Sequence, residues 1–243
     1  MPMRVGAYID GFNLYYRARD QFQDGDRLHR WKWLDLRSVA TSLAGWPGSR
    51  VTRVVYCTAL RSRAGDPTSL ADQEVYLAAL EESGSVDHIE YGAFVTRVKT
   101  GLLVDTRTEP RAVIAPPAPL GLPARPVLTP DGTSGLLVTV EAFEEKGSDV
   151  NVATHLMHDV LTRGVDAAIV VSNDSDLSLP LRLARQKVPV GTVNPGKGPL
   201  AGRLRGGSAD GVGGHWWRRL ERADYLRHQL SDRVGDHVRP SSW

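Results

Sequence analysis

The sequence predicts an α/β protein with an open, mostly parallel central sheet, and two observations lead to this prediction. Short apolar runs alternate with segments of helical periodicity along most of the chain. The runs are continuous rather than alternating, which is typical of strands covered by helices on both faces. Strands that alternate with helices are joined by right-handed crossovers, so we expect three layers: helices, a sheet and helices again.

The predicted elements follow from these two periodicities. Strands are expected at residues 5–9, 51–56, 136–140, 167–172 and 189–193, and helices at 34–43, 72–82, 150–161 and 176–186. In the third helix, Val150, Ala153, Met157 and Val160 have the spacing of one helical face. Pro180 falls in the first turn of the fourth helix, where the missing amide is tolerated.

Composition divides the chain into a main domain, residues 1–196, and two further segments. Within the main domain, residues 97–135 contain seven of the fifteen prolines, which indicates a long, partly disordered surface insertion. Residues 197–214 are rich in glycine and are expected to form a linker. Residues 215–243 are expected to form an amphipathic helix and a tail; this helix either packs on the domain or docks a partner, including a second copy of the chain.

Overall composition is that of a soluble globular protein, with 41% apolar and 24% charged residues and a net charge of +2. Cys57 is the only cysteine, which excludes an internal disulfide and a cysteine-based zinc site, and its apolar surroundings predict a buried core residue. No leader and no membrane-spanning apolar run is recognisable. The expected location is therefore the cytoplasm, without a membrane partner.

Aspartates follow three of the predicted strands. Asp10 ends the first strand, Asp149 follows residues 136–140 and opens a helix, and Asp174 and Asp176 come directly after residues 167–172. In open α/β sheets, the carboxyl ends of strands near a switch in strand order form the ligand crevice. If these strands are neighbours, four carboxylates converge there.

Converging carboxylates require a compensating charge. Two carboxylates about 4 Å apart repel by about 4 kcal/mol at an effective dielectric of 20, so one is protonated or a cation binds. A ligand set made only of oxygen favours Mg²⁺ or Mn²⁺ over zinc. Such an ion polarises a phosphate oxygen and activates water, which predicts metal-assisted phosphodiester hydrolysis.

Each candidate also has a simpler structural interpretation. Asp10, Asp149 and Asp176 have the positions of helix-capping or first-turn acids, and Asp174 that of a turn residue. Asn13 either orients water or phosphate or stabilises its loop. The expected substrate contacts, each with a plain structural or solvated alternative, are Ser172, Asn173, Lys146, Arg203 and Arg205.

Three segments taken in order resemble the NYN domain family of PIN-like ribonucleases: DGFNLYY, EEKGSDVNVATHLMHDV and AAIVVSNDSDLSLPLRLARQKVPVGTVNP. The resemblance covers about residues 3–196, except for the proline-rich insertion. It implies a PIN-like α/β/α sandwich, a divalent-metal aspartate cluster and cleavage of RNA. Asp10 and Asn13 match the family's opening motif, Asp149 matches its K-G-x-D acid, and Asp174 and Asp176 match its D-S-D. His155 stands where many members carry another acid, which leaves the number of metal ions open.

The function expected from the sequence is therefore Mg²⁺- or Mn²⁺-dependent hydrolysis of single-stranded RNA. Asp10, Asp149, Asp174 and Asp176 would hold the ion, and Asn13 with Ser172 would position water or phosphate. One alternative is a non-catalytic RNA-binding or regulatory module on the same fold. Another is a metal-dependent phosphatase or transferase that uses Asp174 and Asp176.

Overall fold

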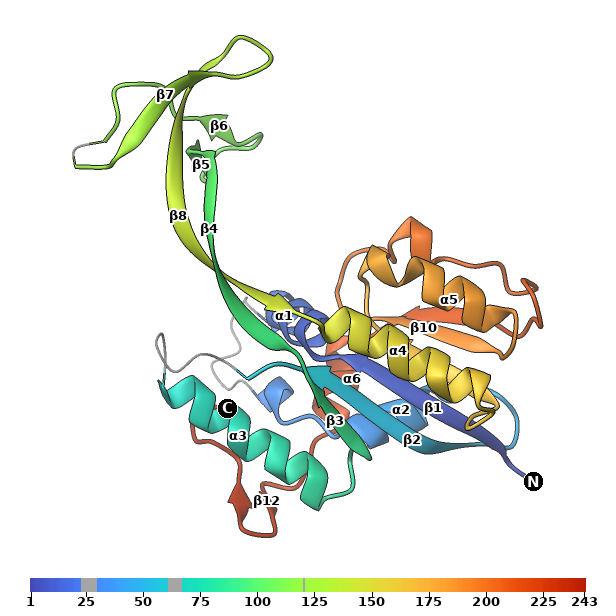
Figure 1. Cartoon of the computed structure of the whole chain (residues 1–243). Coiled ribbons are helices and arrows are strands. Elements are labelled where there is room, and N and C mark those ends of the chain that lie inside the picture. The colour runs from blue at the N-terminus through green and yellow to red at the C-terminus, as the bar shows by residue number, and fades with distance from the viewer. Residues whose placement is uncertain (23–29, 61–66, 120) are drawn as a thin grey trace. The chain divides into compact units, whose positions relative to one another are not determined.

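The computed structural model describes residues 1–22, 30–60, 67–119 and 121–243. Its centre is a six-stranded sheet in the order β11-β10-β9-β1-β2-β3, and every neighbouring pair of strands is parallel (Figure 1). The strands are β1 (Met3–Asp10), β2 (Ser49–Thr58), β3 (His88–Tyr91), β9 (Ala167–Val171), β10 (Val190–Asn194) and β11 (Trp216–Arg219). The order switches direction between β1 and β9, where a doubly wound sheet forms its ligand crevice.

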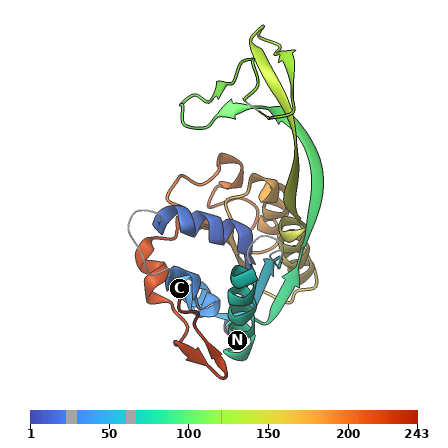
Figure 2. The ribbon, with the colours of Figure 1, turned by 90° about the vertical axis from the view of Figure 1, so that its left-hand side faces the viewer.

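Helices cover both faces of this sheet. On one face, α4 (Ser148–Leu161) and α5 (Ser178–Arg185) pack on Tyr8, Val55 and Val170. On the other face lie α1 (Gly11–Phe22), α2 (Leu36–Leu43), α3 (Pro67–Glu82) and α6 (Arg222–Arg227). Figure 2 shows the blue α1 and teal α3 on one side of the sheet and the yellow α4 on the other. The prediction of a mostly parallel sheet between two helical layers is confirmed.

Most predicted elements are found within a few residues of their expected limits. The helix expected at 72–82 begins earlier, at Pro67, and the one expected at 176–186 is divided into a short 3-10 turn, η2 (Ser175–Leu177), and α5. Two further 3-10 turns are η1 (Arg30–Lys32) and η3 (Gly202–Leu204). No helix of the described residues is both long and apolar enough to cross a lipid bilayer.

The strand expected at 136–140 exists but does not belong to the central sheet. It is part of β8 (Ser134–Lys146), which pairs antiparallel with β7 (Ala124–Leu128), and β4 (Ala93–Leu102) completes that three-stranded sheet. Together with β5 (Val104–Asp105) and β6 (Ala112–Val113), these strands form a compact unit of residues 94–145. The apolar run was misleading because only part of it is buried: Leu136 is 1% exposed, whereas Val140 is 52% exposed.

The proline-rich segment therefore contains more regular structure than expected. Strands β5, β6 and β7 and most of β4 lie within residues 97–135, of which residue 120 is outside the described ranges. Proline is compatible with edge positions of a sheet, and Pro126 sits in β7, which is an outer strand of its sheet.

The helix expected after residue 214 is also corrected. Residues 216–219 form β11, the sixth strand of the central sheet, and only Arg222–Arg227 are helical. Burial alternates along β11, with Trp216 and Arg218 partly buried and Trp217 and Arg219 exposed, which is the period of a strand. A short hairpin, β12 (Arg233–Val234) with β13 (His237–Val238), follows. The preceding glycine-rich segment contributes the buried Leu200 and Leu204 to the core beneath α5.

Gly191 allows β11 to join the sheet. It is paired with Trp216, and a Cβ atom at this position would run into the indole ring. We expect Gly191→Val to lower the free energy of unfolding by about 1–3 kcal/mol through overpacking, as measured by urea denaturation. Gly202→Ala is the control, because nothing lies within 4 Å of its added Cβ; equal losses in the two variants would contradict this packing.

Candidate functional site

Asp10 lies at the switch point between β1 and β9 and is 4% exposed. Its Oδ1 accepts the backbone amide of Asn13 (3.0 Å), and its Oδ2 accepts the hydroxyl of Ser172 (2.9 Å). The Ser172 hydroxyl oxygen in turn accepts the amide of Asp174 (3.1 Å). The carboxylate is thus held by the start of α1 and by the loop after β9, as the sequence predicted from the ends of these two strands.

A second connection joins the same two loops. The side-chain oxygen of Asn13 accepts the amide of Asn173 (2.9 Å), and the side chain of Asn173 bonds to Ala201 and Pro199. Asp174 also caps η2, where its Oδ1 accepts the amide of Asp176 (3.0 Å). The structure therefore brings Asp10, Asn13, Ser172, Asn173 and Asp174 into one hydrogen-bonded group, with Asp176 exposed beside it.

The remaining predicted residues lie on other elements of the chain. Asp149 lies in the first turn of α4, and Lys146 is exposed at the end of β8. Arg203 is exposed in η3, and the Arg205 guanidinium lies 5.2 Å from the ring centre of Trp217. Among the described residues, no three of the four aspartates have carboxylate oxygens within 4.8 Å of one another. The proposed Mg²⁺ or Mn²⁺ centre stays a prediction.

A cavity of about 390 Å³ opens beside Gly11, on the face of the sheet that carries α1 and α3. Its walls are partly aromatic and partly polar, and the aromatic residues include Tyr56 and Tyr76 from the core and Trp243 from the C-terminal segment. The other aromatic lining residues are Phe12, Tyr15 and Tyr16. This volume and lining are typical of a site for a small, flat organic molecule.

The polar groups of the cavity include one cation and one carboxylate. The Lys32 ammonium lies 5.3 Å from the ring centre of Trp243 and 5.8 Å from that of Trp31. Asp72 accepts the hydroxyl of Ser242 (2.9 Å). Burial raises the pKa of Tyr56 and of Tyr76 far above the usual range, so both phenols stay neutral, and the hydroxyl of Tyr76 donates to the Leu34 carbonyl (2.8 Å). The cavity therefore combines aromatic rings with an ammonium group and a carboxylate.

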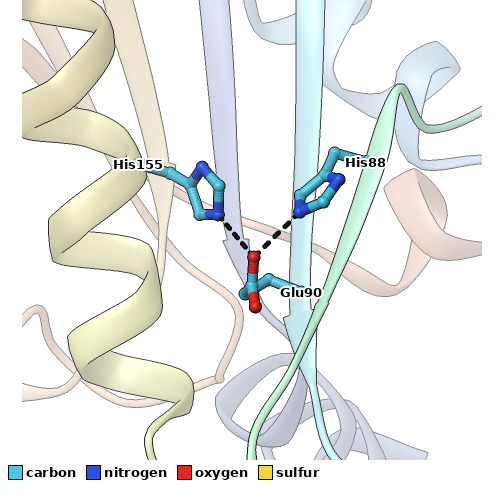
Figure 3. A group of neighbouring side chains, drawn as sticks. All are labelled: His88, Glu90 and His155. Atoms are coloured by element: carbon cyan, nitrogen blue, oxygen red, sulfur yellow. Dashed lines mark hydrogen bonds and ion pairs between the residues drawn. The ribbon is translucent and has the colours of Figure 1, made fainter.

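Sequence reasoning missed a third group, formed by His88, Glu90 and His155 (Figure 3). Nε2 of His88 and Nε2 of His155 lie 2.9 Å and 3.0 Å from the same Glu90 oxygen, Oε2. These hydrogen bonds hold the pKa of Glu90 below its usual range. The signal was the pattern His88-Ile89-Glu90: alternate residues of a strand share a face, so the two polar side chains point away from the buried Ile89.

The third group belongs to the same face of the sheet as Asp10. Asp10 is in register with Cys57 on β2, and Cys57 is in register with Glu90 on β3. With strands about 4.8 Å apart, the Cα atoms of Asp10 and Glu90 are about 10 Å apart. Burial, with Asp10 and Glu90 nearby, raises the pKa of Cys57 to about 12. Cys57 is fully buried, as predicted, and remains a neutral thiol.

Comparison with known proteins adds one informative relative. No family model matches the chain. The 6-hydroxy-3-succinoylpyridine 3-monooxygenase HspA of Pseudomonas putida (strain DSM 28022 / S16) is 28% identical, in an alignment that covers all of this chain and 76% of the relative. A crystal structure of a protein of unknown function from Vibrio parahaemolyticus RIMD 2210633 aligns with 94% of this chain and 97% of its own, at 15% identity and a TM-score of 0.46.

The relative contradicts the expected activity. A monooxygenase similar over the whole chain points to an oxidoreductase, not to a Mg²⁺- or Mn²⁺-dependent endoribonuclease. The expectation of a ribonuclease, a nuclease or any hydrolase is therefore wrong. It rests on the placement of aspartates at strand ends and on the NYN resemblance, and neither observation specifies which reaction takes place at the carboxyl edge of the sheet. Single-stranded RNA as a partner remains untested.

Proposed function

We propose that this chain is a monooxygenase-type oxidoreductase that acts on a small aromatic acid bound in the cavity beside Gly11. The observation that carries the proposal is the similarity along the entire chain to a monooxygenase of a substituted pyridine. The named compound combines a heteroaromatic ring with a succinoyl group. The cavity offers matching chemistry, because aromatic side chains face the ring and Lys32 supplies a cation for the acid.

A monooxygenase inserts one atom of O₂ into its substrate and reduces the other to water, using two electrons and two protons from an external reductant. The chain's own residues in the cavity would orient the ring, exclude water from it and hold its acidic substituent. Tyr56, which stays protonated, can donate a hydrogen bond to a ring hydroxyl or nitrogen, whereas the hydroxyl of Tyr76 donates to the Leu34 carbonyl (2.8 Å) and contributes only its ring.

The turn between β1 and α1 does not fit the dinucleotide that many oxygenating enzymes use. Such a turn carries several glycines, and free amides at the start of the helix receive the pyrophosphate. Here the turn reads Asp10-Gly11-Phe12-Asn13, and the amide of Asn13 already donates to the buried Asp10 carboxylate. A second negative charge at this position would be repelled.

For the fold, we propose the PIN-like arrangement of the NYN family. It is supported by the buried acid at the end of β1, by its bond to the loop after β9, and by a parallel sheet that switches direction between these two strands. The proposal concerns the scaffold alone, since one scaffold hosts many reactions.

The activity is tested with purified full-length chain, 6-hydroxy-3-succinoylpyridine, ¹⁸O₂ and NADH with a flavin reductase as electron source. We expect a product that gains one ¹⁸O atom. Lys32→Met should weaken binding of the compound roughly tenfold. This loss corresponds to the lower end of the free-energy range for a charge-assisted hydrogen bond, because Lys32 is partly exposed. Lys187→Met, an exposed lysine outside the cavity lining, is the matched control. Binding is measured by calorimetry and the product by mass spectrometry, in separate experiments. If the wild type shows no binding and forms no labelled product, the proposal is overturned.

A further inference from the structure

We infer that His88, Glu90 and His155 form a binding site for a divalent transition-metal ion, with two imidazole nitrogens and one carboxylate oxygen as ligands. Within the described residues, this is the one group of three or more potential ligands whose donor atoms lie within 4.8 Å of one another. The inference rests on this geometry and goes beyond the proposed activity, because the site would bind metal whether or not the chain oxidises an aromatic acid.

Two of the three distances between the donor atoms already have the spacing that an ion requires. Adjacent ligands of an octahedral ion, with bonds of about 2.1 Å at right angles, are about 3 Å apart. Nε2 of His88 and Nε2 of His155 lie 2.9 Å and 3.0 Å from Oε2 of Glu90. Figure 3 shows both imidazoles turned toward this oxygen. An ion would replace the two bridging protons, and all three donor atoms already lie within 4.8 Å of one another.

The fold holds these ligands on two well-anchored elements. His88 and Glu90 lie on β3, whose intervening residue Ile89 is buried in the opposite core. His155 lies on α4, which is fixed by the buried Val152 and Leu156 on either side of it in the sequence. A site assembled from a strand and a packed helix is preorganised, which lowers the entropy cost of binding.

The site is also open, as a metal site needs if it is to accept a further ligand. The side chains of His88, Glu90 and His155 are 43%, 38% and 20% exposed. β3 is an edge strand of the central sheet, and no further strand of the described residues pairs with its free edge in that sheet. Water or a small molecule can therefore occupy the coordination positions that the protein leaves vacant.

The donor set determines the kind of ion. Imidazole ligands favour iron, zinc, copper or nickel, whereas Mg²⁺ and Ca²⁺ prefer oxygen. Two histidines and one carboxylate with open positions are the ligands of non-haem Fe(II) sites, and the same set binds Zn²⁺. The site is thus chemically distinct from the all-oxygen aspartate centre expected near Asp10.

The same three residues also satisfy a simpler description, in which the two imidazoles are only hydrogen-bonded to one carboxylate. Metal binding distinguishes the two. Untagged full-length protein is titrated with Zn²⁺, with Fe(II) under anaerobic conditions and with Mg²⁺, using isothermal calorimetry and elemental analysis after gel filtration. We expect one Zn²⁺ or Fe(II) per chain, and no measurable Mg²⁺ at the same concentration.

Four variants locate the ion. His155→Ala and Glu90→Gln, the second of nearly unchanged shape, should weaken Zn²⁺ and Fe(II) binding by about 100-fold or more, since even residues behind the ligands cost 10- to 100-fold. His158→Ala, an exposed histidine on the same helix, and Asp174→Asn in the aspartate group should leave binding unchanged. Circular dichroism confirms that each variant is folded.

Two results would overturn the site: wild-type protein that binds no better than His155→Ala, or binding that survives His155→Ala and Glu90→Gln but is lost in Asp174→Asn. Because the titration involves no organic substrate, its failure is separate from failure of the ¹⁸O₂ experiment.

Discussion

Replacing Asp159 by alanine is expected to lower the free energy of unfolding by about 3 kcal/mol. Asp159 lies on α4, is 6% exposed and accepts two hydrogen bonds on Oδ2: from the Tyr8 hydroxyl (2.9 Å) and from the Arg53 guanidinium (2.5 Å). Burial and the nearby Asp159 raise the pKa of Tyr8 far above the usual range, so the phenol remains a donor. Alanine leaves this buried hydroxyl and the half-buried guanidinium without their shared acceptor.

The comparison of variants separates charge from hydrogen bonding. Asp159→Asn keeps an oxygen for Tyr8 and should lose less than Asp159→Ala. Asp166→Ala is the matched control, because Asp166 also pairs with an arginine, Arg4, but both side chains are more than 40% exposed and solvent screens the pair. Urea denaturation measures all three. A loss for Asp166→Ala as large as that for Asp159→Ala would contradict the role given to burial.

The ion pair between Asp159 and Arg53 also helps to position the proposed metal site. Asp159 is one helical turn beyond His155 on α4, and it ties the helix to β1 and β2 through Tyr8 and Arg53. If the helix shifts when the pair is removed, His155 moves with it. Asp159→Asn is therefore expected to weaken Zn²⁺ binding much less than His155→Ala does.

Trp243→Ala is the second change for which we expect a large effect, on stability and on the cavity together. The indole is 9% exposed, and its ring centre lies 6.2 Å from that of Trp33 and 5.7 Å from that of Tyr76. Removing a buried tryptophan costs about 3 kcal/mol or more through lost burial and an unfilled cavity. One aromatic wall of the substrate cavity is lost as well, so affinity for an aromatic acid should fall roughly 10- to 100-fold.

Trp217→Ala provides the control for this variant. Trp217 is 43% exposed on β11 and does not line the cavity, so its removal should change stability little and binding not at all. Stability is measured by thermal unfolding, and affinity by calorimetry well below the unfolding temperature, where both variants are folded. Unchanged affinity in Trp243→Ala would place the aromatic acid elsewhere.

The residues at the strand ends predicted where the acids lie but not which reaction takes place there. The aspartates were placed correctly with respect to the strand ends: Asp10 and Asp174 do meet through Ser172 at the switch point. Converging acids indicate that a positive charge is needed, but they do not specify whether the reaction at that edge is hydrolysis or oxidation. Only similarity to a monooxygenase decided against the hydrolase.

The sequence alone determined the features that depend on neighbours along the chain. Continuous apolar runs such as residues 167–172 predicted buried parallel strands. The spacing of Val150, Ala153, Met157 and Val160 predicted α4, although Val150 is 61% exposed and lies off the buried face. Local composition also placed Asp10 and Asp174 at the ends of strands, where the structure has them. Periodicity is a property of the local backbone, so it can be recognised in the sequence without knowledge of the fold.

Tertiary structure decided what depends on pairing between distant segments. Residues 136–140 have the composition of a central strand, yet pairing with β7 places them in a different sheet. Residues 216–219 belong to a segment with the pattern of an amphipathic helix. They form a strand instead, because Gly191 on β10 leaves room for the Trp216 ring. His155 is 65 residues from Glu90, and only the packing of α4 against β3 brings them together. Local sequence does not determine such contacts, because the same side chains could pack against several distant segments. The partner is fixed only when the whole core is assembled.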